Sequence, residues 1–252
     1  MINPLKFDKA QIACWGHVAP FTVWVGVILL LQVFDALSTC PRWMCPWSYA
    51  LKTFVCAALF FWLKPWSIYG GSWRLGHLPL ALCVGALVAA VWIIPETPAF
   101  GGAFHRWLIM PPGSFPDYYN PAFYPALPPG HIARAFMPQE AGWIMTLIRL
   151  AGSACVIAVI EEFFFRGFFY RWLRRSRFWE IPLATFDLQS FITVTAVFAL
   201  EHDRWFAGLI AGAAYGWLAI RTDSVWTAAA AHFTTNLLLG LFVIMSEQYG
   251  FW

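Results

Sequence analysis

The stretch AGSACVIAVIEEFFFRGFFY, residues 151–170, decides how this sequence is interpreted. It is apolar and aromatic except for three ionisable side chains, Glu161, Glu162 and Arg166. A charged group at membrane depth costs roughly 2.5–3.5 kcal/mol on insertion scales. Because the cost of three such groups is large, we expect this helix to use them.

The composition indicates a membrane protein. Of the 252 residues, 60% are hydrophobic and 12% are charged, whereas a soluble domain is about half apolar and about a quarter charged. We predict an all-α fold, a polytopic transmembrane helical bundle of about seven (six to eight) helices. The predicted helices cover residues 18–37, 47–65, 77–95, 143–172, 187–202, 205–221 and 225–246.

The predicted bundle forms a single integral membrane unit in two parts. Residues 1–142 hold the N-terminal helices and a long loop, about 96–142, rich in proline and aromatic residues. Residues 143–252 hold the helical core. The small net charge of +3 and the scattered basic residues argue against nucleic acid as a partner.

Lysine and arginine positions predict the orientation. With a cytoplasmic N-terminus, the basic loops all fall on the cytoplasmic side, as the positive-inside rule requires. The long loop and the C-terminus are then outside, and a disulfide between Cys40 and Cys45 is compatible with that side. The residues that carry this prediction are Lys6, Lys9, Lys64, Arg74, Arg171, Arg174, Arg175, Arg177 and Arg221.

Helical spacing separates the two adjacent glutamates. Glu162 and Arg166 are i,i+4 neighbours and are predicted to pair, while Glu161 points about 100° away and is left to face a water or a substrate. Such a division of roles is typical of acid–base sites. The alternative is an intramembrane ion pair that only locks helix packing.

Two further polar clusters lie downstream. Phe198 and His202 share one helix face, and His232 and Asn236 share another. Taken alone, His202 fits an interfacial histidine, and the second pair fits hydrogen-bonded contacts between helices. A stripe of small residues between the clusters, at 208, 212 and 216, allows close helix approach and is expected to bring them together.

In order, the motifs EExxxR (161–166), FxxxH (198–202) and HxxxN (232–236) resemble those of the CAAX prenyl protease and bacteriocin-processing (Abi) family of intramembrane glutamic endopeptidases. The resemblance covers about residues 143–246, and it implies that residues 143–252 form the catalytic core, with the catalytic helices in the C-terminal half. It implies a hydrolase of the bacterial inner (cytoplasmic) membrane whose partners are the lipid bilayer and a membrane-associated peptide or protein substrate, lipidated or not.

The resemblance also implies residue roles. Glu161 would take a proton from water, His202 would hold that water, and His232 with Asn236 would stabilise the oxyanion. Glu162, paired with Arg166, would orient the site.

Three other functions stay open. The first is a zinc-dependent membrane protease, since one glutamate and two histidines could ligate zinc; because HExxH is absent, we expect no cofactor. The second is a non-catalytic accessory or immunity protein of the same fold. The third is a proton-relay transporter, although the paired halves typical of transporters are not found.

Overall fold

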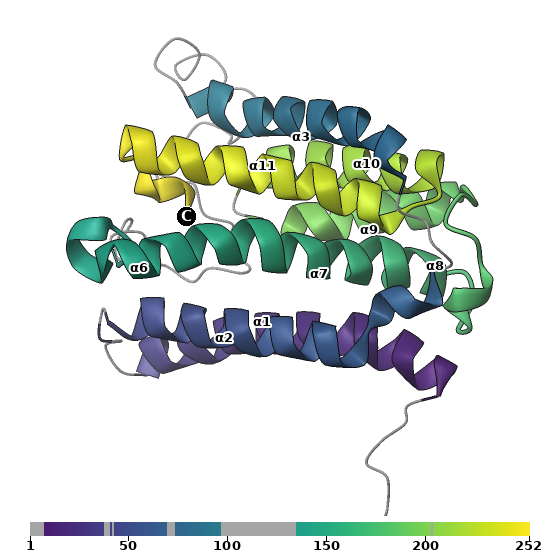
Figure 1. Ribbon diagram of the computed structural model, residues 1–252, viewed down its shortest axis with the longest axis horizontal. Helices are drawn as coiled ribbons and strands as arrows, with labels where there is room; N and C mark the ends of the chain where they lie inside the picture. Colours follow the sequence, from purple (N-terminus) through teal and green to yellow (C-terminus); the bar gives the residue numbers. More distant parts are fainter. Residues whose placement is uncertain (1–7, 38–40, 42, 70–73, 97–134, 203) are drawn as a thin grey trace, which may run out of the picture.

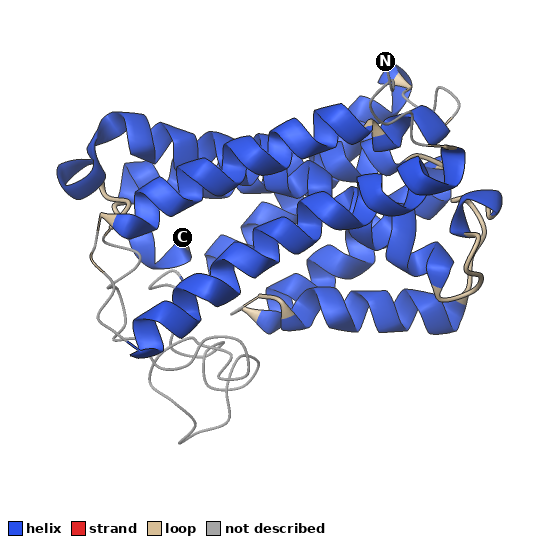
Figure 2. Ribbon diagram, turned by 90° about the horizontal axis from the view of Figure 1, so that it is seen from below, coloured by secondary structure: helices blue, strands red, loops and turns tan. Residues whose placement is uncertain are grey.

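The computed structural model describes residues 8–37, 41, 43–69, 74–96, 135–202 and 204–252. Within these ranges every regular element is helical and no strand occurs (Figure 2). All seven predicted helices are present, so the predicted helical bundle is confirmed. Five helical segments are long and apolar enough to cross a membrane: Lys9–Phe34, Met44–Ile68, Leu75–Ile93, Pro138–Trp172 and Val225–Ser246.

Helix α1 spans Lys9–Leu37, so the predicted start at residue 18 is wrong. A capping box explains the early start: the backbone N–H of Gln11 donates to Asp8 Oδ1 (2.7 Å), and the backbone N–H of Asp8 donates to Gln11 Oε1 (2.9 Å). Pro20 lies inside the helix, where its carbonyl accepts a hydrogen bond from the Cys56 thiol (3.3 Å).

Helices α2 (Met44–Leu63) and α3 (Leu78–Ile93) lie close to their predicted positions. Short 3₁₀ turns, Pro65–Ile68 and Leu75–His77, flank the connection between them. Most of the predicted loop 96–142 and the predicted disulfide partner Cys40 lie outside the described residues.

The helix predicted at 143–172 is a chain of five segments. These are α6 (Pro138–Ala151), a π-helix (Gly152–Ile157), α7 (Ala158–Glu162), a second π-helix (Phe163–Phe169) and α8 (Tyr170–Trp172). It begins before residue 143 because one turn precedes Gly142, whose φ of 77° and ψ of 157° interrupt the helix. The π-helices enclose the segment carrying Glu161 and Glu162, and such bulges are frequent at functional sites.

The last three helices are α9 (Leu188–Leu200), α10 (Trp205–Thr222) and α11 (Val225–Ser246). Side chains cap two of them: Asp187 Oδ1 accepts from the Ser190 N–H (2.8 Å), and Ser224 Oγ accepts from the Thr227 N–H (3.3 Å). At 13 residues, α9 is too short to cross a bilayer alone.

The segmented helix lies in the middle of the bundle (Figure 1). Helices α1 and α2 pack on one side of it, and α3, α9, α10 and α11 lie on the other. The small-residue stripe allows the close helix approach that was predicted. A Cβ on Gly208 would lie 3.1 Å from the Ala199 Cα, and a Cβ on Gly212 would lie 3.3 Å from the Phe198 ring. The stripe therefore sets the close packing of α10 against α9.

One end of the bundle joins α1, the turn after α2 and α8. The buried His17 ring lies 2.6 Å from the Tyr69 hydroxyl, and Arg171 donates to the same hydroxyl (2.9 Å). A Cβ on Gly167 would meet that hydroxyl at 2.5 Å, so only glycine allows this approach. Three segments that carry basic residues in the sequence therefore meet at one end.

Candidate active site

The predicted pairing of Glu162 with Arg166 is present. Arg166 Nη1 donates to Glu162 Oε1 at 2.9 Å, and the side chains are 3% and 0% exposed. Arg166 Nη2 donates to the Gly212 carbonyl (2.8 Å), which ties the segmented helix to α10. The Arg166 guanidinium also stacks on the Phe198 ring, 4.6 Å from its centre. The ion pair is therefore held by α9 and α10 as well as by its own helix.

His232 lies between the two glutamates. Its Nδ1 is 3.0 Å from Glu162 Oε1, and its Nε2 is 3.8 Å from Glu161 Oε2. The ring is 4% exposed, and the Glu161 side chain is 15% exposed. Helices α7 and α11 thus bring together two carboxylates and an imidazole that are 70 residues apart in sequence.

Aromatic rings fix the plane of the His232 imidazole. Tyr215 of α10 stacks on it at 4.8 Å with an interplanar angle of 21°, and Phe198 of α9 meets it edge-on at 5.8 Å. The Tyr215 hydroxyl donates to Thr235 Oγ1 (2.7 Å), whose own hydroxyl donates to the Gly85 carbonyl of α3 (2.8 Å). The histidine is held from two neighbouring helices.

His202 shares the face of Phe198, as predicted. Their ring centres are 4.7 Å apart, and His202 Nδ1 lies 2.7 Å from the Phe198 carbonyl. Trp92 of α3 meets the His202 ring edge-on at 5.4 Å. The Phe198 ring is therefore shared by both histidines and by Arg166. Because α9 ends at Leu200, His202 lies just beyond the end of the helix and beside the Phe198 ring.

Asn236 lies one turn beyond His232 on α11, and its Nδ2 donates to the Ser153 carbonyl at 2.9 Å. Ser153 belongs to the first π-helix. The amide nitrogen carries two hydrogens, so this bond leaves one for another acceptor. The predicted placement of Asn236 in a cavity shared with His232 stays a prediction.

Sequence reasoning missed four residues that shape this cluster. The first is Glu201, which directly follows α9 and whose carboxyl is close enough for its charge to act on Glu161. Its position directly before His202 could have identified it from the sequence. The sequence is a poorer guide to Tyr215, Thr235 and Gly85, because their contacts join residues on different helices.

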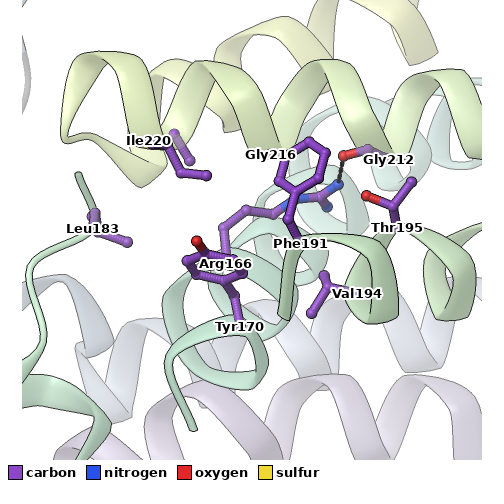
Figure 3. Close-up of a pocket in the computed structure, with 10 residues that line it drawn as sticks. Arg166, Tyr170, Leu183, Phe191, Val194, Thr195, Gly212, Gly216 and Ile220 are labelled. Carbon is purple, nitrogen blue, oxygen red and sulfur yellow. Dashed lines mark hydrogen bonds between the residues drawn. The ribbon is translucent and has the colours of Figure 1, made fainter. Parts of the chain in front are cut away.

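Two cavities lie near these helices. A small one of about 10 Å³, enough for one water, is bordered by Arg166 and by α9 and α10 (Figure 3). In this view the guanidinium reaches toward Gly212 while Phe191, Val194 and Thr195 line the space. A second cavity of about 410 Å³ is apolar and is lined by Ala57, Phe60, Phe61, Trp66, Cys155, Val156, Val159, Ile160 and Trp226.

Among the described residues, no group of three His, Cys, Asp or Glu side chains has an arrangement suited to holding a metal ion. Glu162 Oε1 accepts hydrogen bonds from both Arg166 and His232. A metal ion bound to His232 Nδ1 would therefore have to displace the hydrogen bond between His232 and Glu162. The expectation of metal-free chemistry stays a prediction.

Residues 143–238, less than half of the chain, match the family model described as type II CAAX prenyl endopeptidase Rce1-like. The matched segment contains all three motifs, and the match confirms the predicted resemblance. It supports a CAAX-type intramembrane protease family, and together with the apolar helices it indicates an integral membrane protein. The comparison with curated proteins gave no match, and the comparison with solved structures gave none either.

Proposed function

We propose that this protein is an intramembrane endopeptidase that hydrolyses a peptide bond of a membrane-associated protein or peptide with a glutamate-activated water. The observation that carries the proposal is the position of His232 between Glu161 and Glu162, braced by Arg166. A merely structural ion pair requires only Glu162 and Arg166, and so leaves Glu161 and His232 unexplained.

Glu161 acts as the general base. Its carboxylate Oε2 is 3.8 Å from His232 Nε2, too far for a direct hydrogen bond, and a water about 2.8 Å from each atom satisfies that separation. Glu161 removes a proton as the water oxygen attacks the carbonyl carbon. The same carboxyl then delivers the proton to the leaving nitrogen as the C–N bond breaks. A positioned proton acceptor contributes about 10²–10⁴-fold.

Glu162 holds His232 in one orientation. Nδ1–H of His232 donates to Glu162 Oε1, so Nε2 faces the reacting groups. The negative carboxylate also stabilises the ring when it is protonated, as a buried carboxylate does for other catalytic histidines. In this mechanism His232 carries a proton on both ring nitrogens from the start of the cycle, so Nε2–H donates to the oxyanion without taking a proton from the attacking water.

Asn236 and His202 complete the site in this proposal. The second Nδ2–H of Asn236 adds an oxyanion donor, and each such donor contributes about 10²–10³-fold. His202 holds the attacking water from the α9 side. Serine, cysteine and threonine take no part as nucleophiles.

The membrane orientation is part of the proposal. The N-terminus lies in the cytoplasm, because the contacts among His17, Tyr69 and Arg171 gather three basic segments at one end of the bundle. The membrane is the bacterial inner membrane. We extend the endopeptidase chemistry of the matched family to this chain, and prenylation of the substrate is not part of the proposal.

The test is cleavage of a library of membrane-inserting peptides by the purified protein in lipid nanodiscs. We expect Glu161→Gln to lose activity by at least about 10²-fold, while Glu180→Gln, on an exposed ion pair away from the cluster, cleaves as wild type does. Equal cleavage by wild type and Glu161→Gln would refute the role of Glu161. Activity that disappears with a strong chelator and returns with zinc would replace this mechanism with a metal-dependent one.

A further inference from the structure

A second charged cluster lies between α1, α2 and α6, and the proposed chemistry does not use it. Lys52 is 6% exposed, and its Nζ lies 4.2 Å from the centre of the Trp24 ring and 5.0 Å from that of Tyr49. The Arg149 guanidinium lies over the same Tyr49 ring at 4.3 Å. One tyrosine therefore contacts two cations of like charge.

Neither cation has a carboxylate partner among the described residues. Within that part of the chain, no carboxylate lies within ion-pair distance of Lys52 or Arg149. Arg149 Nε is buried without a partner. Arg149 is close enough for its charge to act unfavourably on Lys52. Contacts with aromatic faces offset only part of the cost of burying such charges, so the cluster is electrostatically incomplete.

The cluster lies inside the bundle rather than at the headgroup layer. Lys52 is eight residues into α2 and Arg149 is seven beyond Gly142, or about 10–12 Å along each helix at 1.5 Å per residue. A lipid phosphate would have to leave the interface to reach them. A peptide that enters the bundle to be cleaved brings its own carboxylates to this depth.

The cluster also adjoins the candidate active site. The Tyr49 hydroxyl donates to the Arg149 carbonyl (3.2 Å), and the charge of Glu161 acts on Tyr49. A Cβ on Gly152 would lie 2.8 Å from Tyr49 and from Thr53, so α2 packs directly against the first π-helix.

We propose that Lys52 and Arg149 form a subsite that binds a carboxylate of the substrate peptide, next to the catalytic groups. The carboxylate comes from the C-terminus of the peptide or from an Asp or Glu side chain. Each cation can donate to one of the two oxygens of a carboxylate, and charge-assisted hydrogen bonds are the strong ones. The subsite rests on the proposed function in one respect, which is that the proposed function identifies the ligand as a peptide.

Binding, rather than cleavage, tests the subsite. The full-length Glu161→Gln protein is placed in phosphatidylcholine nanodiscs, so that peptides are not consumed. Fluorescein-labelled membrane-inserting peptides are compared in three forms: C-terminal acid, C-terminal amide, and amide with one Glu near the C-terminus. We expect at least one carboxylate form to bind about tenfold more tightly than the plain amide, equivalent to about 1.4 kcal/mol.

Substitutions then locate the effect. Lys52→Met and Arg149→Met should each reduce the acid-over-amide preference, and Lys52→Arg should keep it. Lys64→Met, which removes an exposed lysine at the end of the same helix, should have no effect. The acid and amide forms are compared on one folded protein, so a variant that fails to fold does not prevent the test.

Three results would overturn the subsite. The first is equal binding of acid and amide forms. The second is a preference that survives both methionine substitutions. The third is displacement of the acid peptide by phosphatidylglycerol added to the nanodiscs, which would assign the cations to a lipid headgroup. A carboxylate preference without cleavage of any peptide by wild type would instead refute the proposed function and leave the subsite standing.

Discussion

Replacing Glu162 with glutamine should destabilise the protein strongly while changing its shape little. Glu162 Oε1 accepts hydrogen bonds from Arg166 (2.9 Å) and His232 (3.0 Å), and the side chain has no exposed surface. Removing one partner of a buried ion pair costs about 3–5 kcal/mol, since the other charge stays buried. Arg166 keeps its bond to the Gly212 carbonyl, so we expect a loss near the lower end, about 3 kcal/mol.

A double-mutant cycle isolates the pair. The free energy of unfolding is measured in mixed micelles by SDS titration, with tryptophan fluorescence as the signal, for Glu162→Gln, Arg166→Met and the double variant. Because the double variant leaves neither charge unpaired, its loss should be smaller than the sum of the single losses, with a coupling energy of about 2 kcal/mol.

The matched control is the exposed pair Arg175 and Glu180. Its atoms are 3.0 Å apart, but the side chains are 60% and 36% exposed. Solvent screening should limit its coupling to below about 1 kcal/mol. If the coupling energy of Glu162 with Arg166 is no larger than that of the control pair, burial does not strengthen the interaction between Glu162 and Arg166.

Three further predictions concern other parts of the bundle. Gly85→Ala places a Cβ too close to the Ala231 carbonyl oxygen of α11 and should lower the free energy of unfolding by about 1–3 kcal/mol. Gly26→Ala, with nothing within 4 Å, should be neutral in the same assay. Tyr215→Phe loses one hydrogen bond, worth about 1 kcal/mol of stability, but keeps the stack on His232. Its cleavage rate should therefore stay within about tenfold of wild type, whereas Tyr215→Leu should lose more, and equal rates would contradict the positioning role of the ring. Hydrogen bonds to Ser190 lower the pKa of Asp187 below its ordinary value of 3.8. Its contribution to stability is thus complete above that value and is lost as the pH falls through the lowered pKa; Asp187→Asn should remove this pH dependence, as measured by unfolding at pH 2 to 6.

Local periodicity accounts for what could be predicted of the site. An apolar run of membrane length predicts a helix, since backbone groups in hydrocarbon must bond within the helix. The spacing of Glu162 and Arg166, and of Phe198 and His202, then places each pair on one face. Both contacts are present, at 2.9 Å between side-chain atoms and 4.7 Å between ring centres.

The misplaced helix start has a local cause. The prediction began the first helix at 18, beside Pro20, whereas the observed helix starts at Lys9. Asp8 and Gln11 form a capping box that was visible in the sequence and compensates the exposed backbone donors there. This first turn is polar, so the apolar run that predicts the helix does not include it.

Most helix positions, the pairing of Glu162 with Arg166 and the small-residue face of α10 follow from the sequence, since each depends on residues within one or a few helical turns. The placement of His232 against both glutamates does not, because it depends on how α7 and α11 pack across 70 residues of chain. The same holds for the Tyr215 stack, for the Glu201 carboxyl near Glu161 and for the meeting of Lys52 and Arg149 over the Tyr49 ring. Packing between helices sets which polar groups meet in the bundle interior, and spacing along one helix carries no information about its neighbours. Tertiary structure alone therefore brings His232 of the third motif against the two glutamates of the first.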